Sequence, residues 1–413
     1  MANVKDKIVK LFLKSKIIRN FVIKVFDKVN YVDNNLFKEK KNIENSSDKN
    51  LIEEDIAESY RINCRKSHLN IKRINLLIPA LALKYVFGGI STAISFFNEI
   101  RKGFDNARII LTEESNFTHD SNPNFSEWNL LSMDSEDECG LVIVSCGDSS
   151  NRTLSVSEND RFIATAWWTA INASRINKWQ NESFDNDKKN KFIYLIQDYE
   201  PGFYPWSSRY AMAESTYQNP ENFIAVFNTN FLYDFFRSEG YTFYDYFIFD
   251  PILNSELKKM RDISMQKKRE KQILVYGRPG VERNCFQIII MTLKLLISKR
   301  DITGWKFLSA GEYHEPVYLG NGNILNSLGK LSLEEYANIL GNSAIGISLM
   351  VSPHPSYPPL EMAAFGMKVI TNKYHSKDLS VLSDNIYSLD SLFPEVVEDV
   401  LFKIMQDIDK TDF

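Results

Sequence analysis

The chain has 413 residues, more than one hydrophobic core usually organises, and its 44% hydrophobic and 25% charged residues are typical of a folded globular protein. Its net charge of −4 and the lack of a basic stripe give no electrostatic reason to expect a nucleic-acid partner. Four cysteines without a C-x-x-C spacing and five scattered histidines argue against a disulfide framework and against a zinc or histidine-built metal site. We therefore expect two domains in a reducing compartment, with no metal ion, no cofactor and no nucleic acid.

The first element expected along the chain is an amphipathic helix over residues 5–28. Eight Lys and Arg stand against two Asp in this segment, and apolar residues recur at helical spacing. This pattern is typical of a helix that lies on an anionic membrane surface, and also of a helix packed on the protein body or on a second subunit. Because no apolar run reaches the ~20 residues that span a bilayer and no cleavable signal peptide is visible, we expect a cytoplasmic protein that is peripheral to the inner face of the cell membrane.

A polar stretch over residues 30–49 is expected to be a linker, and short apolar strands then alternate with helices. The expected elements of this first half are strands at 73–81, 107–112, 140–146, 191–200 and 222–229, and a helix over 88–103 that opens with Gly88 and Gly89. A charged stretch over 244–268 reads as the connection to a second domain.

The same alternation restarts after residue 270. We expect strands at 271–277, 305–311, 344–350 and 368–372, and helices at 283–300 and 332–343, the latter with a capping box formed by Ser332 and Glu335. Two such runs predict an α/β protein with two parallel, doubly wound sheets. The expected divisions are a helical extension with linker (1–70), a first domain (71–245) and a second domain (246–413).

Ligands of doubly wound sheets bind at the carboxyl ends of the strands, and the stretch "SPHPSYPPLEMAAFGMKVITN" (352–372) lies at such a place. No G-x-G-x-x-G and no Walker A lysine motif is present, which argues against hydride transfer and phosphate-loop hydrolysis. The four prolines predict a stiff loop that ends at a helix start, where free backbone amides would bind an anion. A nucleoside diphosphate would fit, with its phosphates on these amides and on Arg278, or more weakly Arg283, and with a sugar hydroxyl on Glu361.

These residues resemble a known family. "PPLEMAAFGMKVITN" is similar to the donor-site signature of GT-B glycosyltransferases. "YLIQDYEPGFYP" (194–205) and "YGRPGVERN" (276–284) resemble the bacterial rhamnosyltransferases that build S-layer and surface polysaccharides, over roughly residues 73–374.

The resemblance implies a GT-B fold, in which two Rossmann-like domains face a central cleft, with the acceptor on the first domain and the nucleotide sugar on the second. It also implies dTDP-L-rhamnose as donor and a growing, lipid-linked glycan as acceptor. Many relatives carry a further Glu eight residues before the one matching Glu361, where this chain has Pro353. The missing contact to the sugar is then expected from His354, Ser356 or Tyr357.

The remaining candidates have both a functional and a structural interpretation. Lys330 and the backbone groups of Gly329 and Leu331 match the loop that binds the base and phosphate of the nucleotide in such folds. The alternative is that Lys330 is a solvated surface lysine. Leu360 belongs to the helix turn that also carries Glu361.

Gly88 and Gly89 would let the backbone approach the donor, or simply make a tight turn. Asp198 and Glu200 follow a strand and would supply the catalytic base of an inverting enzyme or bind acceptor hydroxyls in a retaining one, unless they form a helix cap or a buried salt link. Trp168, like its neighbour Trp167, could stack on acceptor rings or pack in the core.

An Asp-x-Asp match at residues 185–187 lies in a hydrophilic run before a strand, and we expect it to be loop and not a metal site. The sequence therefore predicts a metal-independent rhamnosyltransferase. The alternatives are a GT-B transferase that uses a UDP- or GDP-sugar, a catalytically idle sugar-binding partner of a glycan assembly complex, and a sugar-nucleotide epimerase of the same fold.

Overall fold

The computed structural model describes residues 56–410, except positions 87, 148–150, 186–189, 252 and 265–267. The helix expected at 5–28, the linker at 30–49 and most of the Asp-x-Asp match lie outside the described residues. The segment Ile56–Phe413 forms a compact unit of its own. None of the helices described within it combines the length and the apolar character needed to cross a membrane.

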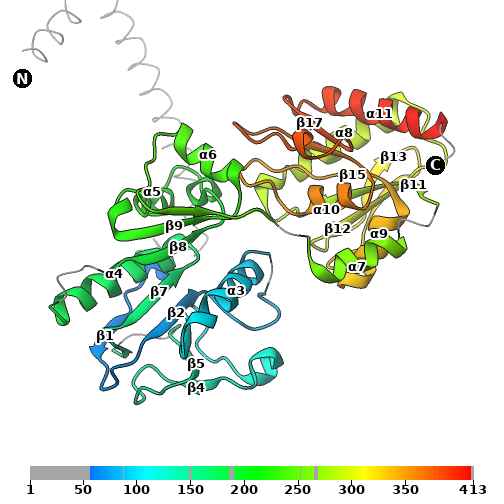
Figure 1. Ribbon diagram of the computed structural model, residues 1–413. Coiled ribbons are helices and arrows are strands. Elements are labelled where there is room, and N and C mark those ends of the chain that lie inside the picture. The colour runs from blue at the N-terminus through cyan, green and yellow to red at the C-terminus, as the bar shows by residue number, and fades with distance from the viewer. Residues whose placement is uncertain are drawn as a thin grey trace, which may run out of the picture. The chain divides into compact units, whose positions relative to one another are not determined.

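The first large sheet contains eight strands, all paired in parallel, in the order β10-β9-β8-β7-β2-β3-β5-β4 (Figure 1). Its strands are β2 (Arg73–Ile78), β3 (Asn106–Leu111), β4 (Asn129–Leu131), β5 (Leu141–Ser145), β7 (Asp160–Ala164), β8 (Phe192–Ile196), β9 (Phe223–Phe227) and β10 (Tyr246–Ile248). The chain adds β3 and β5 on one side of β2 and then places β7 on the other side, so the direction of winding reverses between β2 and β7. A smaller sheet pairs β1 (Asn63–Lys66) with β6 (Thr153–Val156).

The second large sheet has seven strands in the order β13-β14-β12-β11-β15-β16-β17. Its strands are β11 (Glu270–Gly277), β12 (Lys306–Gly311), β13 (Val317–Gly320), β14 (Asn323–Ser327), β15 (Ser343–Ile347), β16 (Lys368–Asn372) and β17 (Ile386–Leu389). Every pair is parallel except β13 with β14, which form an antiparallel hairpin. Here the winding reverses between β11 and β15, which lie side by side.

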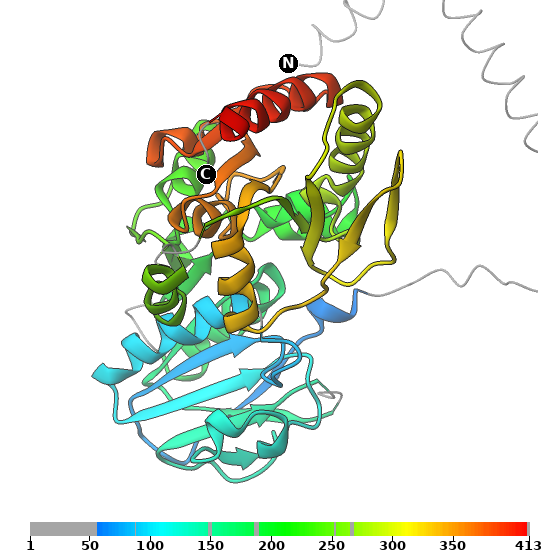
Figure 2. The same cartoon turned by 90° about the vertical axis from the view of Figure 1, so that its right-hand side faces the viewer.

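Helices cover both faces of each sheet, as a parallel sheet buried on both sides requires. On the first sheet, α3 (Gly88–Ile100) packs on one face, and α4 (Trp167–Ser183) and α6 (Asn230–Ser238) pack on the other (Figure 1). On the second sheet, α8 (Phe286–Lys299) and α11 (Pro394–Lys410) share one face, and α7 (Ser255–Ser264), α9 (Leu333–Asn342) and α10 (Pro358–Ala364) share the other (Figure 2). A further helix, α5 (Ser208–Ser215), follows β8.

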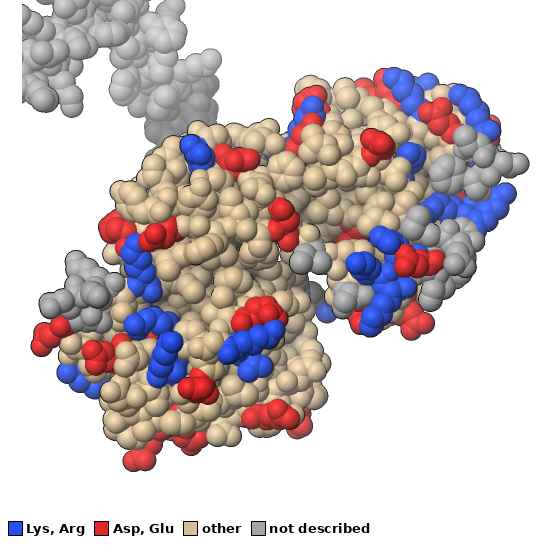
Figure 3. All heavy atoms as spheres, viewed as in Figure 1, with Lys and Arg blue, Asp and Glu red and all other residues tan. Residues whose placement is uncertain are grey.

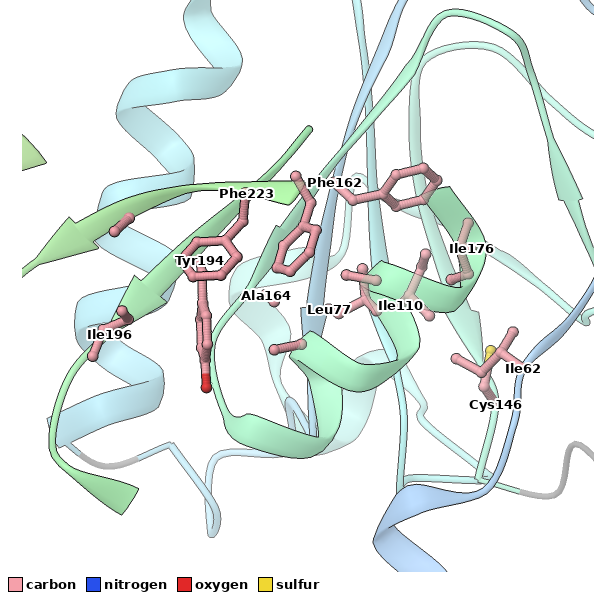
Figure 4. Close-up of a cluster of buried hydrophobic side chains, with 14 of the residues drawn as sticks. Ile62, Leu77, Ile110, Cys146, Phe162, Ala164, Ile176, Tyr194, Ile196 and Phe223 are labelled. Carbon is pink, nitrogen blue, oxygen red and sulfur yellow. The ribbon is translucent and has the colours of Figure 1, made fainter. Parts of the chain in front are cut away.

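The core of the first sheet is rich in aromatic side chains. Figure 4 shows Phe162, Tyr194 and Phe223, from three strands of the sheet, in one cluster that also contains Ile176 of α4, and all four are almost completely buried. Apolar side chains thus fill the space between sheet and helices, which stabilises the scaffold that holds the loops at the strand ends.

Charged residues are distributed differently inside and outside this unit. Figure 3 shows acidic and basic side chains interspersed on the face viewed, in line with the small net charge. Inside, Arg73 and Arg108 are fully buried with the carboxylates of Asp137 and Asp160. The Arg73 guanidinium donates hydrogen bonds to Asp160 Oδ1 at 2.8 Å and to Asp137 Oδ1 at 2.6 Å. The cluster lies at the amino ends of β2 and β7, the opposite edge of the sheet from the one where ligands of such folds bind.

The predicted fold class is confirmed: two doubly wound α/β sheets of predominantly parallel strands are present. The capping box of α9 is also confirmed, because Ser332 Oγ accepts from the Glu335 N–H and Glu335 Oε2 accepts from the Ser332 N–H. Two strands lie outside the bounds expected for the first domain, residues 71–245. β1 lies before residue 71, and β10 lies after residue 245 and pairs with β9 of the first sheet. The stretch expected as the interdomain connection therefore contains a strand of the first sheet and the helix α7.

Candidate functional site

The carboxyl ends of the two sheets line one cavity of about 490 Å³. From the first sheet, its walls come from the segments that follow β2, β7, β8 and β9, and from the second sheet they come from the segments that follow β11 and β15. Both points at which the winding reverses are thus represented, and these are the places where ligands bind in open α/β sheets. Eleven of the residues named as candidates line the cavity: Gly88, Gly89, Trp168, Asp198, Glu200, Arg278, Arg283, His354, Ser356, Tyr357 and Glu361.

Two arginines give the second-sheet wall a positive charge. Arg278 follows β11 directly, and within the described chain its guanidinium has no hydrogen bond or ion pair to a protein group. The Arg283 guanidinium lies 4.1 Å from the centre of the Phe203 ring, and its Nε is buried without a hydrogen bond, 4.0 Å from Asp198 Oδ2. Burial lowers the pKa of Arg283, and the like charge of Arg278 adds to this effect. A bound anion would relieve that repulsion and satisfy both side chains.

Glu361 lies on α10, and one of its two carboxylate oxygens accepts a hydrogen bond from the protein. The Tyr336 hydroxyl donates to Glu361 Oε2 at 3.0 Å, whereas Glu361 Oε1 has no hydrogen-bond partner among the described residues. Burial raises the pKa of Glu361, and the Tyr336 hydrogen bond acts against this rise. Tyr336 thus holds the carboxyl group in place while its second oxygen remains able to accept a ligand hydroxyl.

The start of α10 offers fewer unpaired amides for an anion than the sequence predicts. The helix begins at Pro358 and Pro359, which have no N–H, and the Glu361 N–H donates to the Tyr357 carbonyl at 2.9 Å. In the described structure the amides of Tyr357 and Leu360 have no such partner, and of these two residues Tyr357 lines the cavity and Leu360 does not. The prolines stiffen the loop, but positive charge in the cavity comes from side chains.

Asp198 forms part of a contact between the two sheets. Its Oδ1 accepts hydrogen bonds from the Ser352 hydroxyl and from the Tyr199 N–H at 2.8 Å. The same Ser352 hydroxyl accepts from the His354 N–H at 3.1 Å. A carboxylate from the first sheet therefore positions the proline-rich loop of the second sheet, in addition to any contact with a ligand.

Glu200 begins the short 3₁₀ helix Glu200–Phe203 and caps α4, because its Oε2 accepts the Trp167 N–H at 2.5 Å. Burial raises the pKa of Glu200 from 4.5 to about 8, an effect that the Trp167 N–H opposes and the charge of Asp198 reinforces. At neutral pH this pKa keeps Glu200 mostly in its acid form, which is able to donate a hydrogen bond.

This pKa predicts a pH-dependent stability. Between pH 4.5 and about 8 the unfolded chain has released the Glu200 proton and the folded chain keeps it, so the free energy of unfolding falls as the pH rises through this window. Glu200→Gln should remove this part of the decline, and urea unfolding at about pH 5 and pH 8 would measure it. Glu221→Gln, at an exposed position, is the control; equal pH dependence of the Glu200→Gln variant and wild type would contradict the assignment.

The loop that carries His354 and Tyr357 is anchored by buried polar groups. Asn372 accepts the Met350 N–H at 2.7 Å and donates to the Met350 carbonyl at 3.0 Å, so it extends the pairing of β15 and β16 beyond the strand ends. Lys377, fully buried, donates to the same carbonyl at 2.7 Å, and burial lowers its pKa to about 7. At the far end of the loop the Tyr357 hydroxyl lies 3.2 Å from Thr92 Oγ1 of α3.

The glycines at the start of α3 face open space. An added Cβ at Gly88 would meet nothing within 4 Å, and one at Gly89 would reach the Gln197 side chain at 3.7 Å. The protein itself thus leaves room for a side-chain atom at both positions, and any requirement for glycine would come from a ligand.

Four predicted residues do not line the cavity: Gly329, Lys330, Leu331 and Leu360. The first three follow β14; Gly329 is buried with φ +62 and its carbonyl accepts the Gly311 N–H at 2.9 Å, and Lys330 is exposed. These contacts give Gly329 a structural role in linking the ends of β12 and β14.

Several lining residues were missed by the sequence reasoning, among them Gln197, Asn228, Tyr276 and Tyr336. Gln197 and Asn228 come directly after β8 and β9, so their positions at strand ends could have identified them. Four cavity residues have a buried side-chain atom without a hydrogen bond in the described structure, namely Trp168 Nε1, Gln197 Oε1, Asn228 Oδ1 and Arg283 Nε. Buried polar atoms are nearly always paired in native proteins, so a polar ligand or an ordered water would complete these hydrogen bonds.

Comparison with protein families gives two matches, in chain order. Residues 73–230 match the N-terminal domain of WsaF, and residues 271–401 match the C-terminal domain of WsaF. A curated relative, "O-antigen biosynthesis protein RfbC" of Myxococcus xanthus, is 33% identical over 214 residues, which cover 52% of this chain. The aligned part is 15% of that protein's length.

Solved structures share the architecture at low sequence identity. HepE of Anabaena, determined in complex with UDP and glucose, has a TM-score of 0.55 at 11% identity, over 83% of this chain and 92% of that chain. The lipopolysaccharide outer core galactosyltransferase WaaB has a TM-score of 0.51 at 10% identity, over 81% of this chain and 90% of that one. The fold is therefore the GT-B fold.

Proposed function

We propose that this chain, which carries both domains of the WsaF family in residues 73–230 and 271–401, is a glycosyltransferase of polysaccharide biosynthesis. It would transfer the sugar of a nucleoside diphosphate sugar to a glycan acceptor in the cavity between the two sheets. The observation that carries this proposal is one cavity lined by Arg278, which has no ion pair in the described chain, by Arg283, whose Nε has no hydrogen bond, and by Glu361, which has one free carboxylate oxygen.

The arrangement suits departure of a diphosphate. Charge builds up on the leaving phosphate as the glycosidic bond breaks, and fixed cations close to it lower the barrier. Arg278 is placed to bind that charge and Arg283 to support it, which makes transfer without a metal ion part of the proposal. Glu361 Oε1 would accept a hydroxyl of the ribose or deoxyribose and so fix the nucleotide.

The first-sheet wall would hold the acceptor. Asp198 would accept the proton of an acceptor hydroxyl if the reaction inverts configuration, while Glu200, as a neutral acid, would donate a hydrogen bond to an acceptor oxygen. In a retaining reaction both would bind acceptor hydroxyls. Gly88 and Gly89 would allow close approach of the donor.

For the donor we propose dTDP-L-rhamnose and for the acceptor a growing, lipid-linked surface glycan. The support is the resemblance of residues 194–205 and 276–284 to rhamnosyltransferases, and a deoxyribose offers a single 3′ hydroxyl that one carboxylate oxygen can bind. The basic segment at residues 5–28 would attach the enzyme to the anionic membrane that carries such an acceptor.

Calorimetric titration with dTDP, UDP and GDP tests this proposal. A clear preference for dTDP is expected, and a preference for UDP or GDP would reassign the donor sugar while keeping the transferase. No binding of any of the three would contradict the transferase and favour a sugar-binding partner without activity.

Glu361→Gln should weaken nucleotide binding without disturbing the fold. The amide keeps the size of the side chain but places a donor where the free oxygen accepts, so we expect at least tenfold weaker dTDP binding, about 1.4 kcal/mol. Glu334→Gln on the exposed side of α9 is the matched control and should bind like wild type. Unchanged affinity of the Glu361→Gln variant would show that the nucleotide binds elsewhere.

A further inference from the structure

Asn228 and His354 meet at the boundary between the two sheets, and both are buried. Asn228 follows β9 and is 2% exposed, and His354 lies in the proline-rich loop and is 8% exposed. The Asn228 amide nitrogen lies 3.2 Å from His354 Nε2, and both residues line the cavity. As placed, this contact leaves Asn228 Oδ1 buried without a partner.

The other ring nitrogen of His354 decides how the Asn228 amide is oriented. His354 Nδ1 accepts a hydrogen bond from the Ser356 N–H at 3.0 Å, so Nδ1 carries no proton. Burial lowers the pKa of His354 to about 4, so the ring is neutral at physiological pH and its single proton is on Nε2. A protonated Nε2 needs an acceptor, and the atom of Asn228 that can accept is Oδ1.

The oxygen and nitrogen of an asparagine amide are distinguished by their hydrogen bonds rather than by shape. With Oδ1 on His354 Nε2, the Asn228 NH₂ group occupies the position of the unpaired atom. That position then holds two N–H donors that no described protein group accepts. An oxygen of a bound ligand would complete the arrangement.

We propose that Asn228 donates a hydrogen bond from Nδ2 to a sugar oxygen in the cavity, with His354 as the positioning residue that fixes the amide orientation. This inference rests on the proposed transferase function and names a contact for its sugar. A neutral amide suits a hydroxyl or ring oxygen. A phosphate is less suited, because Asp198 lies close by through Ser352, whose hydroxyl contacts both Asp198 and the His354 N–H.

The tautomer of His354 gives a first test that needs no ligand. In a long-range ¹H–¹⁵N spectrum of protein labelled at its five histidines, with His354 assigned from the His354→Gln variant, we expect the proton on Nε2. Asn228→Asp places a carboxylate against that nitrogen and should raise the pKa of His354 by at least one unit. Asp198, Lys377 and Arg283, the other charged groups that act on His354, are unchanged in this variant. A proton on Nδ1 would overturn the proposal.

Measurements on the Asn228→Ala variant show whether the sugar oxygen belongs to the donor or to the acceptor. If the oxygen belongs to the donor sugar, affinity for dTDP stays within about twofold of wild type and affinity for dTDP-L-rhamnose falls by about tenfold. If it belongs to the acceptor, both nucleotide affinities are unchanged and the KM for octyl α-L-rhamnoside rises by about tenfold. Asn326→Ala, at an exposed position of β14, is the control.

No change in either measurement would overturn the inference. Failure of the proposed function looks different, since wild type itself would then bind none of dTDP, UDP and GDP, and the sugar contact would fall with it. A wild-type protein that binds dTDP-L-rhamnose, together with an Asn228→Ala variant that behaves identically, overturns this inference alone.

Discussion

Arg278→Ala is expected to weaken nucleotide binding by about 10- to 100-fold. Hydrogen bonds to charged groups are typically worth about 1.5–3 kcal/mol, and each 1.4 kcal/mol is a factor of ten in affinity. The Arg278 guanidinium has no hydrogen bond or ion pair to a protein group in the described chain, so its removal breaks no polar contact of the fold. The loss should therefore be seen in calorimetry with dTDP and not in the free energy of unfolding.

The geometry of the guanidinium adds a second comparison. Arg278→Lys keeps the charge but loses the planar pair of donors, so an affinity between those of alanine and wild type is expected. Arg152→Ala removes an exposed arginine outside the cavity lining and should bind like wild type. If the Arg278→Ala variant binds dTDP with wild-type affinity, then the anion does not bind at the second sheet.

The largest loss of stability is expected from Asp160→Asn. Asp160 is fully buried and accepts hydrogen bonds from Arg73 Nε at 2.8 Å, Arg73 Nη2 at 3.0 Å and the Ser157 N–H at 2.9 Å, while Arg108 Nη2 lies at 3.4 Å. Breaking a buried ion pair from one side leaves uncompensated charge and costs about 3–5 kcal/mol. Urea unfolding should show this reduction in the free energy of unfolding.

An exposed ion pair supplies the comparison. Glu99→Gln breaks the pair with Lys102 on the protein surface, where the distance is 2.6 Å and both side chains are about 70% exposed. Such pairs contribute about 0–1 kcal/mol because water screens them. If Asp160→Asn costs as little as Glu99→Gln, then the buried cluster does not hold β2 to β7.

Local patterns in the sequence predicted most of the strands that carry the site. Arg278 and Asp198 were identified because each follows a strand, and parallel strands bring such positions to one edge of a sheet. The strand β7 was missed although it is central, because the run Asp160–Ala164 begins with two charged residues, whose burial depends on partners far away in the sequence. The helix α11 and the hairpin of β13 and β14 were not predicted either.

One expectation is met only in part, because of the local geometry of the backbone. The proline-rich turn suggested free amides, but two consecutive prolines remove two donors, and the Glu361 amide is bonded to the Tyr357 carbonyl. A sequence motif gives the position of a turn, whereas its hydrogen bonds depend on the course of the backbone before it.

The sequence by itself determined the two α/β repeats, the cap of α9 and the candidates Arg278 and Glu361, because periodicity, caps and strand ends are local properties of the chain. Only the tertiary structure brought Tyr336 to Glu361, Asn228 to His354 and Ser352 to Asp198. The members of the last two pairs are separated by 126 and 154 positions, and it is the packing of two separate sheets that brings them within hydrogen-bond distance.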